Sequence, residues 1–488
     1  MATLDELRSE RIRKLTILKD KGINPYPTKT NKELTLSEVA GDFSKLSKRK
    51  KPLTVIGRIM AIRSFGGSIF IDLYDGTGTF QVYLKKDEIG DKAFRLFTET
   101  IDIGDFIEAT GSLFVTKKKE KSLLAVSWRI LSKSLRPLPE KWHGLQDVEE
   151  RFRRRYLDIV MSPVVRDRFI VRSKIIEAIR TSLNKEDFIE VETPMLQTVA
   201  GGATARPFVT HHNALDVDLS LRIAPELFLK ELLVAGYSRV YELGRSFRNE
   251  GIDVTHNPEF TTIEAYAAYE TPETEMARIE KLINGVVTKV LKKKDVSYGE
   301  EVIHFSKKFA VVPFAKLVKQ YMLIGENDLM NREVLSLKAK QFGISPASHE
   351  GPEKILDNIY KKIIRPKIID PTFIVEYPAA FSPLAKRIEG KEGYINRFQL
   401  VIGGTEIVNG FAELNDPLEQ EARFVEQEAK RKEGDEEAQI KDMEYIEALE
   451  HGMPPATGWG LGIDRLVMLL TDTKNIREVI IFPTLRPK

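Results

Sequence analysis

The chain has 488 residues, of which 42% are hydrophobic and 30% charged, a composition typical of a soluble globular protein with about two to four domains. It lacks Cys, which excludes a disulfide scaffold, a thiolate zinc site and a Cys nucleophile and favours a reducing cytoplasm. It also lacks a signal-peptide core and any apolar run of membrane-spanning length. The net charge is +3, yet residues 1–150 carry 27 basic and 21 acidic residues, which suits a bound polyanion or, at least equally, an ordinary charged surface.

The first part of the chain has the pattern of a helix followed by a small barrel. The apolar spacing of residues 4–21 predicts a helix that ends at Gly22. Five short β runs follow, separated by glycine-rich turns and by one helical stretch near 91–99. Five strands with this punctuation predict a closed barrel of the OB-fold type. We therefore assign residues 1–50 to an N-terminal helical extension and 51–140 to an OB-fold domain.

After a connector that contains two prolines, the pattern changes to mixed helix and strand. Residues 168–183 form an amphipathic helical pattern that leads into a strand at 189–196. Hairpin-like pairs of strands are predicted at 239–269 and 397–414. This mixture indicates an α+β domain. The boundaries are 141–165 for a linker, 166–488 for the α+β domain and about 300–390 for a helical insertion within it.

The usual phosphate-binding signatures are missing from the sequence. It contains no GxxxxGK[ST] segment, and GLGIDR at 460–465 lacks the third glycine of a dinucleotide fingerprint. A nucleotide would therefore have to be bound in another way.

Alternation along three strand segments predicts a binding surface instead. Residues two apart in a strand share a face. Each segment places charged or amide groups beside an aromatic side chain on one face, with small or apolar residues opposite. The aligned residues are Arg248 and Glu250, then Phe260, Thr262, Glu264 and Tyr266, and finally Asn409, Phe411 and Glu413. A single Glu or Arg of this kind is more often part of a solvated strand face, so the prediction depends on the three segments together.

The same segments resemble the motifs of a known family. FRNEG at 247–251 with HNPEF at 256–260 resembles motif 2 of the class II aminoacyl-tRNA synthetases, GLGIDR resembles motif 3, and the helix and strand that end in EVETPML resemble motif 1. Together with the barrel and the segments PELFLKELL, GGATARPF and NGFAELNDP, the likeness is specifically to the lysyl-tRNA synthetases and covers nearly the whole chain.

The resemblance implies a fold, a reaction and partners. The fold is a class II antiparallel sheet flanked by helices, preceded by an OB-fold barrel that binds the anticodon. The reaction is ATP-dependent attachment of L-lysine to tRNA(Lys) through a lysyl-adenylate, with Mg²⁺ acting together with ATP. The enzyme is expected to be a cytoplasmic homodimer formed through the motif 1 region.

The resemblance also implies how ATP is bound. Arg248 is expected to hold the α-phosphate and the substrate carboxylate with the two-pronged face of its guanidinium group. Arg248 and Arg465 are the two residues expected to be catalytic. Glu250 is expected to accept a hydrogen bond from the adenine amine. Phe260 is expected to stack under the adenine, with Arg465 over the other face. The remaining ATP-binding residues implied are His256, Asn257, Glu406 and Gly462.

Lysine carries two ammonium groups and one carboxylate, so its pocket needs two anions and one cation. The resemblance implies that Glu226 binds the α-amino group, although a Glu after Pro at a helix start also simply complements the helix dipole. Glu413 and Tyr266 are the pair implied for the ε-ammonium. The remaining lysine-binding residues implied are Gly201, Arg248, Glu264, Asn409 and Phe411.

The metal site departs from the family pattern. Glu406 matches one metal-binding carboxylate, but Gln399 stands seven residues earlier, where the family usually has a second one. We expect Mg²⁺ to bind more weakly, or fewer ions to bind, without loss of activity. On a plain strand Glu406 is out of phase with Asn409, and a β-bulge at Asn409–Gly410 is one way to re-aim it.

In the barrel, three residues match anticodon contacts. Phe70 and Gln81 match positions where relatives stack on and read the middle anticodon base, and stacking contributes roughly 1–3 kcal/mol per base. Without the resemblance, a core Phe and a surface Gln explain these two residues equally well. Arg63 is expected to meet phosphates.

Three other interpretations remain open. An aspartyl- or asparaginyl-tRNA synthetase of the same subclass would share the motifs, but its pocket needs a cation or an amide reader, whereas this one is rich in Glu. An enzyme that lysylates a protein would normally lack the barrel. A non-catalytic nucleic-acid-binding paralogue is opposed by the joint presence of Arg248, Glu250 and Arg465.

Overall fold

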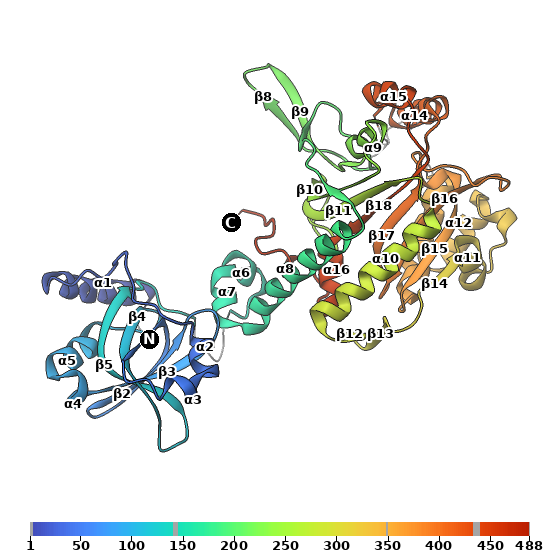
Figure 1. Cartoon of the computed structure of the whole chain (residues 1–488). Helices are drawn as coiled ribbons and strands as arrows, with labels where there is room; N and C mark the ends of the chain where they lie inside the picture. Colours follow the sequence, from blue (N-terminus) through green and yellow to red (C-terminus); the bar gives the residue numbers. More distant parts are fainter. Residues whose placement is uncertain (1–2, 140–144, 348–349, 433–439, 488) are drawn as a thin grey trace. The chain divides into compact units, whose positions relative to one another are not determined.

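The computed structural model of the chain describes residues 3–139, 145–347, 350–432 and 440–487 (Figure 1). It divides into two compact units, Met1–Leu145 and Gln146–Lys488. Residues 141–144 of the predicted linker lie outside the described part. Of the helices that the structure describes, none has both the length and the apolar character needed to cross a membrane.

The first unit is built on a closed barrel with the strand order β1-β2-β3-β5-β4. Its strands are β1 (Leu53–Phe65), β2 (Ser68–Tyr74), β3 (Thr79–Lys85), β4 (Phe106–Val115) and β5 (Lys121–Ser132). Along β2 every second side chain is buried, as expected for a strand with one face in a core. The prediction of a five-stranded barrel is confirmed.

The N-terminal helix is held on this barrel by buried polar contacts. Helix α1 (Leu4–Asp20) begins with a capping box made by Thr3 and Glu6. Its buried Arg11 donates to the carbonyl oxygens of Ser134 and Arg136, each at 3.1 Å. The helix is therefore part of the first compact unit. The other helices of the unit are α2 (Leu36–Gly41), α3 (Phe43–Leu46), α4 (Lys86–Ile89) and α5 (Asp91–Thr100).

The second unit is organised around an eight-stranded sheet with the order β14-β15-β16-β17-β18-β11-β10-β6. The strands are β6 (Ile189–Glu190), β10 (Arg239–Phe247), β11 (Glu259–Ala268), β14 (Ala310–Pro313), β15 (Thr372–Pro378), β16 (Tyr394–Ile402), β17 (Thr405–Ala412) and β18 (Ala456–Gly462). The neighbours from β15 to β10 pair antiparallel, and only the outermost pairs β14–β15 and β6–β10 are parallel. The predicted antiparallel sheet is confirmed.

One face of the sheet carries the main hydrophobic core. Helices α8 (Pro163–Asn184), α10 (Pro272–Val286) and α16 (Ile463–Leu470) pack there, and Figure 1 shows α8 and α10 crossing the sheet on one side. The core joins apolar side chains of these helices, such as Ile279, to strand residues such as Ile263 and Trp459. The opposite face is therefore the one available for polar chemistry.

A second hydrophobic cluster covers one end of that opposite face. It includes residues of α9 (Glu226–Val234), α14 (Pro417–Lys432) and α15 (Met443–Glu450) together with Tyr266 and Phe411 of the sheet. The other α-helices and strands described in the unit are α6 (Val148–Arg153), α7 (Arg155–Met161), α11 (Phe314–Met322), α12 (Arg332–Gln341), α13 (Pro352–Ile359), β7 (Leu196–Gln197), β8 (Val209–His212), β9 (Val217–Leu221), β12 (Asp295–Tyr298) and β13 (Glu301–His304).

The range 300–390, predicted to be a helical insertion, contains α11, α12 and α13 and also two strands of the main sheet. The short apolar segments of β14 and β15 lie at either end of the helical block and pair in parallel. Neither segment alternates clearly between buried and exposed positions, which is why periodicity alone did not separate them from the helices.

Candidate active site

Two rows of residues cross five neighbouring strands on the face opposite the main core. The first row is Glu242, Glu264, Gly460, Asn409 and Gln399 on β10, β11, β18, β17 and β16. The second row is Val240, Tyr266, Gly458, Phe411 and Arg397 on the same strands. Directly paired residues of an antiparallel sheet share a face. The separate polar faces expected for β11 and β17 are thus brought together on one surface.

Glycines of β18 form the floor between these side chains. Gly458 and Gly460 separate the polar residues of β11 from those of β17. A Cβ atom at Gly458 would overlap Glu413 Oε1 and the Tyr266 ring. The absence of a side chain at Gly458 therefore lets Glu413 and Tyr266 lie against the β18 backbone, and we call the strip of β18 between the polar residues of β11 and β17 the glycine channel.

A buried cluster of carboxylates lies at one end of this channel. Glu226 at the start of α9 and Glu413 after β17 are 7% and 1% exposed. The Nζ atom of Lys230 lies 2.5 Å from Glu226 Oε1 and 2.6 Å from Glu413 Oε2. Oε2 of Glu413 is thus in contact with Lys230, whereas its buried Oε1 has no hydrogen-bond partner among the described residues. Such an atom fits a further cationic ligand.

The clustering of charge perturbs these carboxyl groups. Burial, followed by the neighbouring Glu226 charge, raises the pKa of Glu264 to about 8. Burial also raises the pKa of Glu413 to about 8, against the opposing effect of the Lys230 ammonium. The Tyr266 hydroxyl donates to Glu264 Oε2 at 3.0 Å. Three carboxyls thus lie close together in a poorly solvated place, which is favourable for binding cations.

The loop of Gly201 lies against the same cluster. Gly202 has φ of +84°, and a Cβ there would approach the Cβ atoms of Glu226 and Ala224 at 2.8 and 3.2 Å. Gly201 is equally tight, because an added Cβ would lie 2.5 Å from Leu227 Cδ1. The glycines allow the loop to pack closely on the start of α9.

At the other end of the channel are the basic and aromatic groups expected to bind ATP. The Arg248 guanidinium lies 5.1 Å from the centre of the Phe260 ring, a cation–π contact. Burial lowers the pKa of Arg248, and its Nε is buried without a hydrogen-bond partner among the described residues. A buried guanidinium donor of this kind fits an anionic ligand such as a phosphate or a carboxylate.

The motif 2 loop and α16 complete this end. Arg465 NH2 lies 3.4 Å from His256 Nε2, and its NH1 donates to the Glu406 carbonyl at 3.4 Å. Asn257 is buried and its Nδ2 donates to the Glu259 carbonyl at 2.6 Å. Glu250 is exposed. The expected ATP-binding residues thus surround one region, although Glu250 points to solvent.

Glu406 is re-aimed by a β-bulge, as expected, but the bulge lies at a different place. Val408 pairs with Leu400 and Glu406 with Val401, so Ile407 is the extra residue, not Asn409–Gly410. The extra residue brings Glu406 onto the face of Gln399, whose Nε2 donates to Glu406 Oε2 at 2.8 Å.

The orientation of the Gln399 amide follows from its partners. A carboxylate only accepts hydrogen bonds, so the amide nitrogen must face Glu406. The amide oxygen accepts from Tyr377 at 2.7 Å and from Tyr360 at 3.2 Å. Gln399 is therefore a buried donor to Glu406, and its oxygen is already engaged by two hydroxyl groups.

Sequence reasoning missed several residues that support this site. Arg397 donates to Asn409 Oδ1 at 2.8 Å. Asp464 accepts from the Thr261 backbone at 2.7 Å and pairs with Arg172 at 2.5 Å, which ties motifs 1, 2 and 3 together. Two simple signals were present in the sequence. Arg397 is two residues before Gln399 and so lies on the same face of the strand, and Lys230 follows Glu226 by one helical turn.

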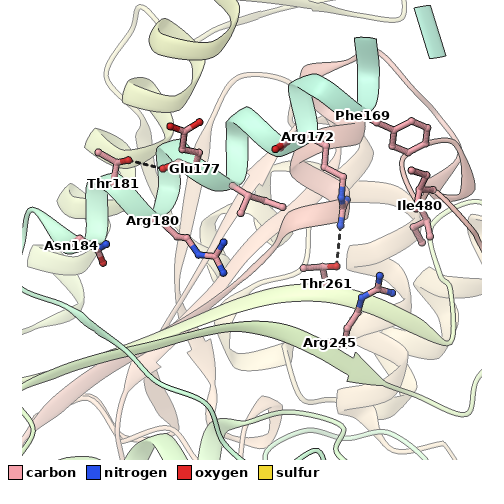
Figure 2. Close-up of a pocket in the computed structure, with 12 residues that line it drawn as sticks. Phe169, Arg172, Glu177, Arg180, Thr181, Asn184, Arg245, Thr261 and Ile480 are labelled. Atoms are coloured by element: carbon pink, nitrogen blue, oxygen red, sulfur yellow. Dashed lines mark hydrogen bonds between the residues drawn. The ribbon is translucent and has the colours of Figure 1, made fainter. Parts of the chain in front are cut away.

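A hollow of about 640 Å³ lies on the other face of the sheet, between α8 and the strands β10 and β11 (Figure 2). Figure 2 shows Arg172 reaching from α8 to Thr261, which it contacts at 2.9 Å, with Arg245 nearby on β10. None of the expected ATP- or lysine-binding residues lines this hollow. It is therefore separate from the candidate active site.

The three residues expected to contact an anticodon lie on one outer face of the barrel. Arg63 pairs across β1 and β2 with Phe70, and Gln81 of β3 pairs with Asp72. Phe70 stacks on Tyr83 with ring centres 4.5 Å apart and planes at 13°. Arg63 forms a two-pronged ion pair with Asp72 at 2.7 and 2.8 Å. This face offers an aromatic stack beside polar groups, as base recognition requires.

Comparison with known proteins finds relatives for both compact units of the chain. A family model described as tRNA synthetases class II (D, K and N) matches residues 147–486, and one described as an OB-fold nucleic acid binding domain matches residues 53–131. The lysine–tRNA ligase of Pelotomaculum thermopropionicum is 46% identical over 99% of this chain and 96% of the relative. The lysine–tRNA ligases of Carboxydothermus hydrogenoformans and a Roseiflexus species are 46% and 43% identical over 99% of both chains. The chain belongs to the class II tRNA synthetases of the D, K and N group.

Proposed function

We propose that this protein attaches L-lysine to tRNA(Lys) in an ATP-dependent reaction that proceeds through a lysyl-adenylate. The observation that carries the proposal is the carboxylate cluster at one end of the glycine channel, made by the buried Glu226 and Glu413 and the half-buried Glu264, with Arg248 and Phe260 at the other end. The names of the relatives, which are lysine–tRNA ligases over the full length of the chain, support the same substrate.

In this proposal the channel holds lysine along its length. Glu226 accepts from the α-amino group, and Glu413 with Tyr266 binds the ε-ammonium, with Glu264 and Asn409 nearby. Phe411 lies along the methylene groups and Arg248 holds the carboxylate. An amino acid without the ε-charge would leave a buried carboxylate unmatched, which costs several kcal/mol. Ornithine, which is one methylene shorter, loses only about 1–3 kcal/mol.

The first chemical step needs no nucleophilic side chain. A carboxylate oxygen of lysine attacks the α-phosphorus of ATP in line, the new C–O–P bond forms, and the bond to pyrophosphate breaks. Arg248 and Arg465 neutralise the charge that develops on the phosphates, while Phe260 orients the adenine. In the second step a ribose hydroxyl of the tRNA attacks the lysyl carbonyl and AMP leaves.

The residues at the metal position fit Mg²⁺ in part. The Glu406 carboxylate lies on the channel face and fits a hard cation that also binds substrate phosphates. Gln399 fits poorly as a ligand, because its oxygen accepts from Tyr360 and Tyr377. We propose that Glu406 holds Mg²⁺ with the phosphates and that Gln399 positions Glu406. When bound, the metal neutralises phosphate charge.

We further propose that the outer face of the barrel binds the tRNA anticodon. Phe70 would stack on a base, Gln81 would read its edge and Arg63 would meet the backbone. The stacked pair of Phe70 and Tyr83 supports this assignment, since an aromatic platform on a partly exposed surface suits an unpaired base.

The motif 1 region supports the proposal of a homodimer. Apolar side chains at and after α8 are unusually exposed: 69% for Val164, 49% for Ile189 and 47% for Met195. They lie in the same segment as the hollow between α8 and the sheet. A second copy covering this surface would remove apolar area from water. We propose a homodimer that works in the cytoplasm.

The most direct test is exchange of radioactive pyrophosphate into ATP in the presence of single amino acids. We expect exchange that depends on lysine, followed by aminoacylation of tRNA(Lys). Exchange with aspartate or asparagine instead would show that the chain is a different member of the same group. Absence of exchange with all three would leave only a non-catalytic role.

A further inference from the structure

Lys230 is a buried cation inside the carboxylate cluster, and none of the roles above uses it. Its side chain has 0% of its surface exposed, and its ammonium contacts one oxygen of Glu226 and one of Glu413. The ammonium also lies 5.3 Å from the centre of the Phe411 ring. An ion pair in this position lines the amino-acid pocket and is shielded from the screening that weakens surface ion pairs.

The charges of the pocket match those of lysine only when Lys230 is counted. Glu226, Glu264 and Glu413 contribute three negative charges when ionised. L-lysine brings two ammonium groups, and its carboxylate is assigned to Arg248. The two substrate ammonium groups and Lys230 therefore equal the three carboxylates in number. Without Lys230 one buried carboxylate would be left unmatched.

The contact also fixes the orientation of Glu413. Lys230 takes Oε2 of this carboxylate, while Oε1 lies beside Gly458 and the Tyr266 ring, on the channel side. The same ammonium holds Oε1 of Glu226. One buried cation thus spans both carboxylates expected to bind the two ends of lysine, and it leaves one oxygen of Glu413 directed at the channel.

We propose that Lys230 is the internal counter-ion of the amino-acid pocket: it neutralises one of three carboxylates, so the pocket keeps two net negative charges and selects a substrate with two ammonium groups. This inference rests on the proposed function, because it names the residue that sets charge selectivity at that same site.

The other charged and titratable groups around Lys230 come from four elements. They are Glu226 on α9, Glu264 on β11, Glu413 after β17 and Tyr445 on α15, and Tyr266 of β11 faces the same carboxylates. The Tyr445 hydroxyl is buried and has no hydrogen-bond partner among the described residues. Lys230 is thus the cation on α9 that faces a group of acidic and hydroxyl side chains, which supports its role as their counter-ion.

The test compares Glu264→Gln in two backgrounds at about pH 8.5, where Glu264 and Glu413, whose pKa values are about 8, are mostly ionised. Lys230→Met keeps an apolar stem but removes the charge, and it should weaken lysine binding on the order of a hundredfold. In the wild-type background Glu264→Gln leaves one net negative charge for two ammonium groups and should weaken lysine binding. In the Lys230→Met background the same change restores two net negative charges and should strengthen it.

Lysine affinity by calorimetry and the lysine KM in pyrophosphate exchange provide the readout. Lys281→Met is the matched control, since this lysine is 75% exposed and pairs with Glu186 at 2.6 Å on the surface; it should bind lysine as wild type does. If Lys230 only supports packing, Glu264→Gln weakens binding in both backgrounds, and the inference is wrong. Wild-type affinity in Lys230→Met also overturns it.

A variant that does not fold and a failure of the proposed function can both be told apart from a failure of this inference. If Lys230→Met does not fold, Lys230→Gln removes the charge while keeping a hydrogen-bond donor, and it enters the same comparison with the same expected reversal. Failure of the proposed function is recognised first, because wild-type protein would then show no lysine-dependent exchange. Failure of the inference is seen only in the variants of an active enzyme.

Discussion

The two ends of the glycine channel differ in the burial and the pairing of their charged side chains. At the amino-acid end, Glu413 and Lys230 are 1% and 0% exposed and contact each other. At the nucleotide end, Glu250 and His256 are exposed, and the buried Nε of Arg248 lacks a partner among the described residues. The amino-acid end is thus a pocket of buried charges that pair with one another, whereas the charged groups of the nucleotide end are exposed or without a partner among the described residues.

This difference explains where selectivity can arise. A buried charge that loses its partner costs several kcal/mol, so the amino-acid end rejects a substrate with the wrong charge. Exposed polar groups are solvated when the nucleotide is absent, so each contact at the other end contributes less. We expect substitutions to affect lysine strongly at one end and ATP moderately at the other.

The largest effect is expected for Glu413→Gln. The amide removes the negative charge beside Lys230 and the substrate ε-ammonium, so kcat/KM for lysine should fall by about two to three orders of magnitude. The measurement is pyrophosphate exchange with lysine varied, and the KM for ATP should change little. An equal effect on both substrates would remove the distinction between the two ends.

A moderate effect is expected for Phe260→Ala at the nucleotide end. Loss of the ring removes the stacking surface for adenine and the contact with Arg248, and the KM for ATP should rise about tenfold. The KM for lysine serves as the internal control and should remain near the wild-type value. An unchanged KM for ATP would show that adenine binds elsewhere.

A pH titration tests the amino-acid end without any substitution. Because Glu264 and Glu413 have pKa values of about 8, ammonium groups bind best once these carboxyls ionise, so lysine affinity should rise as pH increases through about 8. The folded protein binds more protons than the unfolded chain between 4.5 and about 8, so the stability of the lysine-free protein should fall as pH rises through that window.

Thermal unfolding measures both trends in one experiment. The stabilisation by lysine, taken as the increase in Tm at a fixed lysine concentration, should be larger at pH 8 than at about pH 6. A lysine-induced increase that is independent of pH would contradict the raised pKa values of these two carboxyls.

The smallest effect is expected for Gln399→Glu. A second carboxylate beside Glu406 removes the 2.8 Å hydrogen bond and adds repulsion of about 1 kcal/mol, which a bound cation would relieve. The Mg²⁺ concentration for half-maximal exchange should fall by roughly a few fold, and Tm in EDTA should drop by about 2 °C relative to Tm in Mg²⁺. An unchanged Mg²⁺ requirement would contradict the expectation that Gln399, in place of a second carboxylate, weakens Mg²⁺ binding.

The barrel and the central sheet could be predicted from the sequence because their signals are local. Alternation in β11 and β17 placed Glu264 and Tyr266 on one face and Asn409 and Glu413 on another, and strand pairing then brought these faces together through β18. The pairing itself joins Gly460 to Asn409, 51 residues earlier, and to Glu264, 196 residues earlier, so only the family resemblance indicated it.

The remaining features depend on three-dimensional contacts that no local pattern contains. The bulge at Ile407 is set by how β16 and β17 pair, and a sequence pattern could not locate it. The donor role of Gln399 depends on Tyr360 and Tyr377, which approach from different elements. Lys230 followed Glu226 at helical spacing, but an ordinary surface ion pair has the same spacing. Its burial is what distinguishes it.

The central claim is that a buried cluster of carboxylates selects an amino acid with two ammonium groups. Pyrophosphate exchange with lysine and with norleucine, which has the same chain length without the ε-ammonium, tests this claim most directly. We predict that kcat/KM for norleucine is at least about a thousandfold lower than for lysine, because a buried carboxylate is left unmatched. Comparable values for the two amino acids would contradict it.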